Sequence, residues 1–507
     1  METSFTRRET VHVIAGLMLA VFLAGLDQTI VATSLSTMAR DLDGWRLMPW
    51  VVSAYLVSST TTTPIYGRLS DLYGRRPVML VSLGLFVGAS VLCALSQTMP
   101  QLIAARVVQG LGGGGLRAVA QAVMADIIPP RERGRYQGYF ASMFAISSIV
   151  GPALGGFFAE YLSWHWIFWI NVPLGFAALV LSNRNLKRLP VPTRKPTIDW
   201  AGAGLILVSV TPLLIGVSRV EAAGTWLAID VLGPIAAGVV FGIALVMRER
   251  VAPEPMIPLR LFANWTFAVT SVIAFLMYML MMAMTILIAI AYQLAAGLSA
   301  NAAALRVLPL TAGTVLGSFI AGQIVTRTGR YRIFPILGAA SGAVLFAAVA
   351  LVGLGRSLAF DVAATGLIGI GFGFQLSPVM VSVQNALERR DTGIGMSCII
   401  FFRLMGGALG VALFSSVLVG AFNGGVTIVP GFEVLGDNPG LALFHLDEHR
   451  QHLTPALLGG LAGVVDDAFR RVFLVAALIS ALAALGATLL TETPLRGRDT
   501  TDGPPGR

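Results

Sequence analysis

Two ionisable residues lie inside otherwise apolar stretches of the sequence, where a charge is costly. Asp27 falls toward the far end of the stretch 11–34, and Arg106 falls at a similar depth in the stretch 101–124. A charged side chain at the centre of a membrane-spanning helix costs about 2.5–3.5 kcal/mol on insertion scales, so such residues are usually functional. Protonation of Asp27 would remove its charge and release Arg106. The pair is therefore a candidate proton-coupling site, with a fixed salt bridge between two helices as the alternative.

A second group of charges interrupts the apolar pattern in GRLSDLYGRRP, which begins at Gly67, and a related stretch, GQIVTRTGRYR, begins at Gly322. Glycines such as Gly67 and Gly74 permit tight turns and close approach of helices. Asp71 and Arg75 can hydrogen-bond the unpaired groups at the end of a neighbouring helix. We therefore predict a cytoplasmic latch that breaks when the protein changes conformation. The simpler alternative is that these arginines only fix the membrane topology.

Glycine and proline punctuate two further apolar stretches. The stretch GPALGG contains Gly151, Pro152, Gly155 and Gly156. These residues predict a bent helix that approaches its neighbours closely and seals the two halves of the protein against leaks, with a simple packing kink as the alternative. The stretch GLGGGG, from Gly110, could be mistaken for a phosphate-binding loop, but no Lys-Ser/Thr pair follows it. Close helix packing is the better interpretation.

One apolar stretch is rich in methionine and aromatic residues, among them Met277, Tyr278 and Met281. Flexible thioethers and aromatic rings suit a substrate cavity that accepts varied apolar ligands, including cations over ring faces. Packing against lipid is the alternative for about half of these side chains. Two further bases in apolar stretches, Arg117 and Arg403, are expected either to meet an anionic group of a substrate or to pack against helix carbonyls.

The stretch HLDEHRQH, residues 445–452, matches the H-x-x-E-H pattern of some metalloproteases. It would place three histidines on one face of a helix. No surrounding domain supplies a further ligand shell or a substrate cleft, so a solvated helix is the expected structure. We predict no metal site, no cofactor and no enzyme activity.

The composition places these residues in a membrane protein. Of the 507 residues, 56% are hydrophobic and 12% are charged, and the mean hydropathy is +0.79. Soluble domains average about 45–50% apolar and about 25% charged residues. The net charge of +9 does not indicate nucleic acid, because the basic residues gather in short loops between apolar stretches. Cys93 and Cys398 lie inside apolar stretches and are expected to be packing residues.

Apolar stretches that can span a membrane, which takes about 20 residues, occur fourteen times. They cover 11–34, 47–66, 78–96, 101–124, 136–160, 165–183, 200–218, 228–247, 264–293, 303–325, 333–354, 360–384, 393–422 and 470–492. The fold class is therefore predicted to be all-α integral membrane, with 14 transmembrane helices. The basic loops fall on the side of the N-terminus, which the positive-inside rule assigns to the cytoplasm, together with the C-terminus.

The two halves of the chain resemble each other. Offsets of 255 and 259 residues align Gly67 with Gly322, and GLGGGG with GIGFGF. Two six-helix repeats plus two inserted helices are typical of transporters that rock two halves about a site at the midplane. The same offsets align Asp71 with Thr326 and Arg106 with Thr365, so coupling is expected only in the N-terminal half. The predicted units are residues 1–183, a linker with two inserted helices at 184–263, a second half at 264–492 with an outer loop at about 423–469, and a tail at 493–507.

Over nearly the whole chain, these stretches resemble the major facilitator superfamily, and within it the fourteen-span drug:proton antiporters. GRLSDLYGRRP looks like the family's loop signature between helices two and three, and LDQTIV, from Leu26, looks like the first-helix signature of this branch. RVVQG, from Arg106, resembles the fourth-helix signature, and GPALGG resembles the fifth-helix signature of antiporters. WHWIFWINVPLG, from Trp164, is also similar to the branch. Arg117 is a departure from the pattern.

The resemblance implies a proton-driven exporter of diverse lipophilic or cationic drugs in the cytoplasmic membrane. Its partners would be small-molecule substrates, protons and membrane lipid, without nucleic acid, and a monomer is compatible with this function. An exporter dedicated to one metabolite, antibiotic or lipid is the alternative on the same fold. A non-transporting sensor on this scaffold would be expected to lose Asp27, Arg106 or the latch, and all are present.

Overall fold

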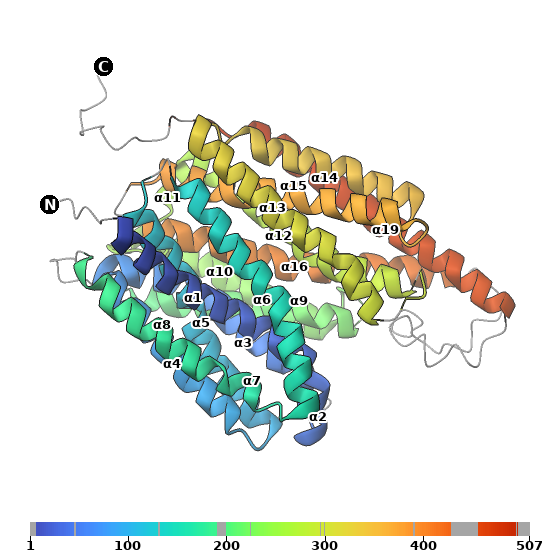
Figure 1. Cartoon of the computed structure of the whole chain (residues 1–507), viewed down its shortest axis with the longest axis horizontal. Helices are drawn as coiled ribbons and strands as arrows, with labels where there is room; N and C mark the ends of the chain where they lie inside the picture. Colours follow the sequence, from blue (N-terminus) through green and yellow to red (C-terminus); the bar gives the residue numbers. More distant parts are fainter. Residues whose placement is uncertain are drawn as a thin grey trace.

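The computed structural model describes residues 7–44, 47–129, 132–189, 199–223, 225–294, 296–298, 300–388, 391–426, 455–492 and 494. Within these ranges the chain forms helices and no strand. The first described helix begins, and the last one ends, at the same end of the bundle, here called the terminal end, and the opposite end is called the distal end (Figure 1). HLDEHRQH, most of the predicted outer loop and nearly all of the predicted tail lie outside the described residues.

A first set of helices covers residues 7–188. It consists of α1 (Arg7–Thr33), α2 (Leu35–Asp41), α3 (Met48–Tyr73), α4 (Arg75–Ala94), α5 (Met99–Ile127), α6 (Arg133–Tyr161), α7 (Trp166–Trp169), α8 (Asn171–Asn185) and a 3-10 turn, η2 (Leu186–Arg188). Within the set, α5 packs against α3 and α4, while α1 packs against α6 and α8. Apolar side chains of these helices form two buried clusters, which hold Asp27 and Arg106 away from solvent.

A second set covers residues 265–488 and has its own buried clusters. It consists of α12 (Trp265–Leu294), α13 (Ala300–Thr328), α14 (Ile333–Val352), α15 (Leu358–Ala386), α16 (Thr392–Val426) and α19 (Pro455–Thr488). Here α13 packs against α15, α12 against α16, and α14 against α19. The two sets meet where α6 contacts α13 and α15, and where α16 contacts α3 and α5.

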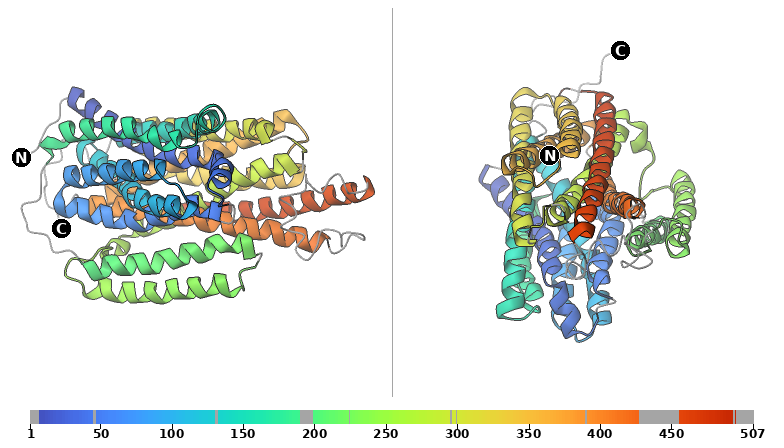
Figure 2. Two further views of the ribbon diagram at one scale, coloured as in Figure 1. Left: turned by 90° about the horizontal axis from the view of Figure 1, so that it is seen from below. Right: turned by 90° about the vertical axis from the view of Figure 1, so that its right-hand side faces the viewer.

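A helical hairpin joins the two sets. It consists of α9 (Trp200–Ala223) and α10 (Ile229–Val251), and the short helix α11 (Arg260–Ala263) follows it. Both views in Figure 2 place the hairpin on one flank of the bundle. α9 contacts α3 and α16, while only 11% of the most apolar stretch of α10 is buried.

Twelve of the described helices are long and apolar enough to cross a membrane. The prediction of fourteen is therefore supported for twelve helices only. The other two predicted spans, 47–66 and 101–124, coincide with α3 and α5, which are helical throughout but are not among the twelve. Their composition explains the difference, because α3 contains the polar run SSTTTT and α5 contains four consecutive glycines and two arginines.

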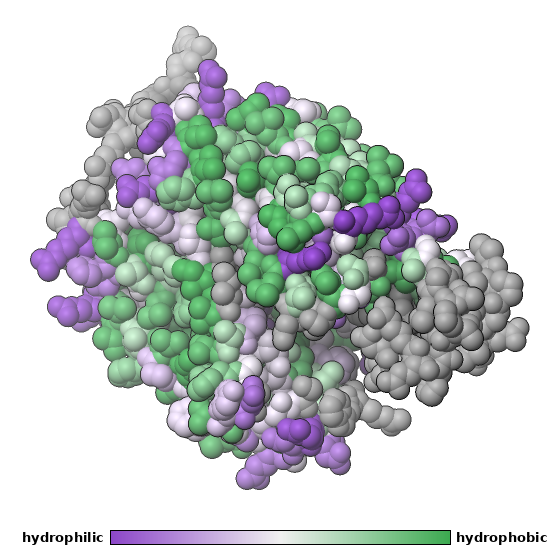
Figure 3. Space-filling view, turned by 45° about the vertical axis from the view of Figure 1, so that its right-hand side comes forward, coloured by the Kyte–Doolittle hydropathy of each residue, from purple (hydrophilic) through white to green (hydrophobic). Residues whose placement is uncertain are grey.

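The outer surface of the bundle is apolar along the helices. The face in Figure 3 is largely hydrophobic, with hydrophilic residues gathered mainly toward its edges. Large side chains such as Val344 and Leu351 are 68% and 72% exposed on α14. A lipid environment accounts for such exposure, because a soluble protein would lose stability by presenting so much apolar surface to water.

The glycine run of α5 permits the close packing that the sequence predicts. A Cβ atom on Gly112 would lie 2.6 Å from the backbone nitrogen of Phe86 and 2.8 Å from the carbonyl oxygen of Ser82, both on α4. Backbone atoms of a packed helix cannot move aside independently. The side-chain-free surface at Gly112 is therefore what lets α4 and α5 touch.

Gly112→Ala is expected to destabilise the protein by about 1–3 kcal/mol, because the added methyl group overpacks the α4–α5 contact. Gly84→Ala on α4 is a matched control, since nothing lies within 4 Å of a Cβ at that position. Alanine favours a helix by about 1 kcal/mol relative to glycine, so the control should be neutral or stabilising. Melting temperatures of the two purified variants check this, and equal shifts would contradict it.

Candidate functional site

Asp27 and Arg106 form a buried ion pair between α1 and α5. Arg106 Nη1 donates to Asp27 Oδ2 at 2.6 Å, and the two side chains are 1% and 0% exposed. The other carboxylate oxygen, Oδ1, accepts hydrogen bonds from Gln109 Nε2 at 2.8 Å and from Asn171 Nδ2 at 3.1 Å. A buried charge is tolerated when it is both paired and hydrogen-bonded, and Asp27 meets both conditions.

Arg106 is held by four other groups. Its Nε donates to the carbonyl oxygen of Val51 at 3.1 Å, and its Nη1 also donates to Gln109 Oε1 at 2.6 Å. Its guanidinium carbon lies 4.3 Å from the ring centre of Tyr55 and 5.9 Å from that of Phe168. Neutralising Asp27 would therefore leave Arg106 with polar and aromatic partners but without a counter-charge.

A second ionic cluster joins the two sets at the terminal end. Asp71 accepts hydrogen bonds from the backbone N–H groups of Gly393 at 3.1 Å and Ile394 at 2.8 Å. Both belong to the first turn of α16, where N–H groups have no partner within the helix and the helix dipole attracts an anion. Arg75 Nη1 donates to Asp71 Oδ1 at 2.5 Å, and its Nε donates to Asp126 Oδ2 at 2.7 Å.

The glycines of this loop allow the contact. A Cβ atom on Gly67 would lie 2.8 Å from the carbonyl oxygen of Gly393 and would clash with the side chain of Ser397. Gly74, which separates α3 from α4, has φ +91°, a backbone conformation that residues other than glycine rarely adopt. Among the described residues, Thr326, the counterpart of Asp71, donates only to Gly322 in its own helix, at 2.8 Å.

Other hydrogen bonds close the same end of the bundle. Ser377 Oγ donates to the carbonyl oxygen of Gly134 at 3.1 Å, and Arg133 Nη1 donates to that of Gln384 at 3.1 Å. Gly134 on α6 and Gly322 on α13 touch through their backbones. At the distal end, α2 and α7 of the first set lie well apart from α19 of the second set (Figure 1). The structure is thus a conformation closed at the terminal end.

The GPALGG residues divide between two environments. Gly151 and Gly155 lie against α1, because a Cβ atom would come within 3.2 Å of Ile30 N at the first and 2.7 Å of Ile30 O at the second. Pro152 is exposed within α6, and nothing lies within 4 Å of a Cβ on Gly156. In this conformation the two glycines bring α6 close to α1 within the first set, and their role in a seal between the halves stays a prediction.

Among the predicted cavity residues, only Tyr278 and Arg403 are partly accessible. Arg403 Nη2 donates to the Tyr278 hydroxyl, and the guanidinium carbon lies 4.0 Å from the ring centre. Met277 and Met281 are 1% and 5% exposed and belong to the core of the second set. In this conformation the two methionines are packing residues, so their role in a cavity stays a prediction.

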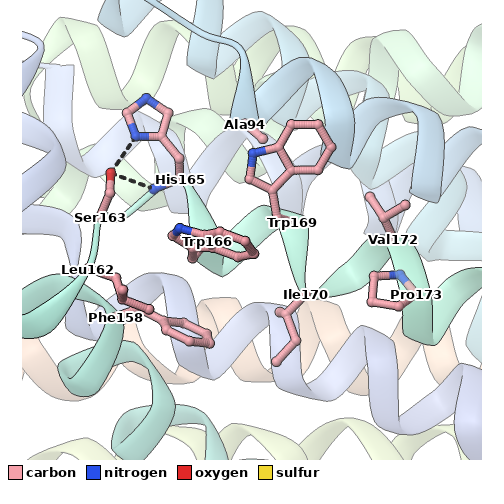
Figure 4. Close-up of a pocket in the computed structure, with 10 residues that line it drawn as sticks. All are labelled: Ala94, Phe158, Leu162, Ser163, His165, Trp166, Trp169, Ile170, Val172 and Pro173. Carbon is pink, nitrogen blue, oxygen red and sulfur yellow. Dashed lines mark hydrogen bonds between the residues drawn. The ribbon is translucent and has the colours of Figure 1, made fainter.

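A cavity of about 980 Å³ lies elsewhere, at the distal end of the first set (Figure 4). It is lined by Ala94, Phe158, Leu162, Ser163, His165, Trp166, Trp169, Ile170, Val172 and Pro173. Ser163 Oγ and His165 Nδ1 are 2.7 Å apart. None of the predicted site residues lines this cavity, and the described residues contain no group of three or more metal-ligating side chains.

An ion pair connects the inserted hairpin to the predicted latch, GRLSDLYGRRP. Arg68 on α3 forms an ion pair with Glu254, which follows α10. Their side chains are 9% and 31% exposed.

A second ion pair lies within the hairpin region, where Asp199, before α9, binds Arg248 at 3.0 Å. Burial alone would raise the pKa of Asp199, but hydrogen bonds from Arg248 and Gly202 outweigh it and lower the pKa below its usual value. The Asp199–Arg248 contact thus stabilises the hairpin at neutral pH and is lost only in strong acid.

A double-mutant cycle with Arg68→Gln and Glu254→Gln is expected to give a coupling free energy of about 0.5–1 kcal/mol, because a part-exposed ion pair is screened by solvent. Unfolding free energies of the four proteins in detergent measure it. The pair Arg219–Asp230, 3.9 Å apart with side chains 45% and 49% exposed, is the control and should give a coupling near zero. Equal coupling in both cycles would contradict a specific tie at Glu254.

Comparison with known proteins places the chain in a family. The sequence pattern of the Major Facilitator Superfamily matches residues 17–411. Multidrug resistance protein 3 of Bacillus subtilis is 34% identical over 426 residues, which cover 83% of this chain and 82% of that protein. An uncharacterized MFS-type transporter of Mycobacterium tuberculosis is 33% identical over 486 residues, which cover 95% of this chain and 70% of that protein.

Solved structures share the fold at low identity. The human organic anion transporter MFSD10 (TETRAN) has a TM-score of 0.63 at 15% identity, over 95% of this chain and 100% of that chain. The proton:xylose symporter XylE has a TM-score of 0.62 at 13% identity, over 97% of this chain and 98% of that chain. At these identities the likeness shows the fold alone. Together with the family match, it leads to one conclusion: the chain belongs to the Major Facilitator Superfamily and is a multi-pass membrane transporter, not an enzyme.

Proposed function

We propose that the protein is a secondary active exporter that exchanges protons for diverse lipophilic or cationic compounds. The observation that carries this proposal is the ion pair between Asp27 and Arg106, fully buried and 2.6 Å long in the middle of an apolar bundle. A carboxylate in this position can bind a proton reversibly and so change the charge of the pathway. The names of the Bacillus subtilis relatives, Multidrug resistance protein 3 and Multidrug transporter protein MdtP, support export of drugs.

The proposed cycle places the terminal end in the cytoplasm, in agreement with the basic loops on that side. The structure then corresponds to an outward-facing state in which Asp71 holds α16 against α3. A proton from outside neutralises Asp27 and frees Arg106, which favours release of the substrate. Breaking of the contacts at Asp71 opens the cytoplasmic side, where Asp27 loses its proton and a new substrate binds.

The fourteen-span architecture belongs to the same proposal. α3 and α5 pack against each other and carry the buried Ser/Thr run and the glycine run at their contact. Neighbouring helices satisfy such polar groups within a membrane. We therefore assign α3 and α5 as two further spans, giving two halves of six spans, residues 1–183 and 264–492, on either side of the inserted hairpin at 184–263.

Transport by the full-length protein in proteoliposomes tests this function. The dye is enclosed in the proteoliposomes, and the external pH is adjusted to impose or reverse a proton gradient. A protonophore abolishes the gradient. Efflux of several unrelated lipophilic dyes, accompanied by proton entry and lost without the gradient, is expected. Dye movement that ignores the gradient, or movement of none of the dyes, would refute proton-driven export of diverse compounds.

A further inference from the structure

Two arginines in the interior of the bundle lack an acidic partner among the residues the structure describes. Arg117 on α5 donates to Gln28 Oε1 at 2.7 Å and to the carbonyl oxygen of Ala24 at 3.2 Å. Arg403 on α16 donates to the hydroxyl group of Tyr278 and lies over its ring. Throughout the described ranges, no ion pair joins either guanidinium to a carboxylate.

Three other arginines with little exposed surface do have such a partner. Arg106 binds Asp27 at 2.6 Å, Arg75 binds Asp71 at 2.5 Å, and Arg306 binds Asp361 at 3.1 Å. Taking a cation out of water is expensive, and neutral hydrogen-bond acceptors do not cancel its charge. Arg117 and Arg403 therefore keep a positive charge that no carboxylate among the described residues compensates.

The two bases lie at similar depth. Arg117 precedes the end of α5, Ile127, by ten residues, and Arg403 follows the start of α16, Thr392, by eleven. At 1.5 Å per residue, both lie about 15–17 Å from the terminal end. α5 and α16 belong to different sets and contact each other, and both arginine side chains are half-buried. Transporters of this architecture bind their substrate near the midplane, between the two halves.

We propose that Arg117 and Arg403 together bind the acidic group of the transported compound, so that the preferred substrates are lipophilic organic anions. The proposal rests on the export function above and changes the charge of its preferred substrates from cationic to anionic. Cations are disfavoured at this site for two reasons. The ring face of Tyr278, which a cation would otherwise occupy, already carries the guanidinium of Arg403 at 4.0 Å, and two positive charges repel a third.

A pair of fluorescent probes with one aromatic body tests the substrate class. N-phenyl-1-naphthylamine is neutral, and its 8-sulfonate is an anion of nearly the same shape. Titration of the full-length protein in phosphatidylcholine nanodiscs, with empty nanodiscs as the blank, gives both dissociation constants. The parent protein is expected to bind the sulfonate at least about tenfold more tightly than the neutral probe, which corresponds to about 1.4 kcal/mol.

Substitutions assign the preference to the two bases. Arg117→Gln and Arg403→Gln should each weaken sulfonate binding about tenfold and leave binding of the neutral probe unchanged. Arg403→Lys should retain part of the preference because it keeps the charge. Arg250→Gln, at an exposed base on α10, is the control and should change neither constant. Unchanged binding of the neutral probe also shows that a variant is folded.

Three results would overturn the proposal. The parent protein could bind both probes with equal affinity, or the arginine variants could lose affinity for the neutral probe as much as for the sulfonate. The third is loss of sulfonate binding when phosphatidylglycerol is included in the nanodiscs. The last result would assign the arginines to a lipid headgroup. Binding requires no proton gradient, so the outcome is independent of proton coupling. An anion preference without gradient-driven efflux would refute the proposed antiport alone, while gradient-driven efflux without an anion preference would refute this inference alone.

Discussion

Asp27→Asn is expected to lower the rate of proton-driven efflux by about 100-fold or more, while the protein remains folded. Asparagine keeps the shape of Asp27 and can still accept a hydrogen bond from Arg106, but it cannot bind and release a proton. The uncoupled variant should still exchange substrate down its own concentration gradient, because that movement needs no change of charge at position 27. Gradient-driven efflux and counterflow of the same dye, measured in the same proteoliposomes, separate the two activities.

Matched controls sharpen this test. Asp230→Asn removes an acidic side chain that is 49% exposed on the hairpin and should leave both activities intact. Arg106→Gln should lower stability more than Asp27→Asn does, because it leaves a buried carboxylate without its counter-charge, a loss of about 3–5 kcal/mol. If Asp27→Asn retains the gradient-driven rate of the parent, Asp27 is a structural residue and the coupling group lies elsewhere.

Asp71→Asn is expected to shift the conformational equilibrium toward a state open at the terminal end by about tenfold. The change removes a negative charge from the start of α16 and weakens the charge-assisted bonds to Gly393 and Ile394. A charge at a helix N-terminus contributes about 0.3–1 kcal/mol, and a hydrogen bond to a charged group about 1.5–3 kcal/mol. Since 1.4 kcal/mol corresponds to a factor of ten, the expected shift is within reach of measurement.

Distances between two spin labels report this shift. Cysteines at Arg184 on α8 and just beyond α13 at Arg330 are exposed at the terminal end in different sets, whereas the native Cys93 and Cys398 are buried. A larger population of long distances is expected in Asp71→Asn. Thr326→Val is the matched control, because the Thr326 hydroxyl donates to Gly322 within its own helix. Identical distance distributions in the parent and Asp71→Asn would show that Asp71 does not hold this end closed.

The sequence was sufficient to predict that Asp27 could pair with Arg106 but not to predict the full set of partners of the pair. Equal depth in two apolar stretches predicted that Asp27 could meet Arg106, and the structure places them 2.6 Å apart. Gln109 and Asn171, which complete the network, are single polar residues in apolar stretches, so the same signal would have found them. Asp126, the second partner of Arg75, lies 51 residues from it. Such a pairing depends on the rotation of each helix about its axis, which hydropathy does not encode.

Two features of the fold could not be derived from the sequence, for related reasons. Hydropathy measures average polarity, so it cannot distinguish an exposed polar helix from α3, whose Ser/Thr run is buried against α5. Similarly, the spacing of Gly151 and Gly155 places both on one face of α6 but does not identify the neighbour. The structure identifies it as α1. In each case the missing information is which helices are adjacent, and this is set by the packing of the whole bundle.

The lipid-exposed hairpin has a consequence for how the membrane acts on the transporter. Most of the apolar surface of α10 is not covered by protein, so its vertical position follows the thickness of the hydrocarbon layer. Because Glu254 holds Arg68 beside the loop at Asp71, a displacement of the hairpin pulls on the contact that keeps α16 in place. Transport should therefore be fastest in one range of acyl-chain lengths and slower in thinner or thicker bilayers, and Glu254→Gln should flatten this dependence.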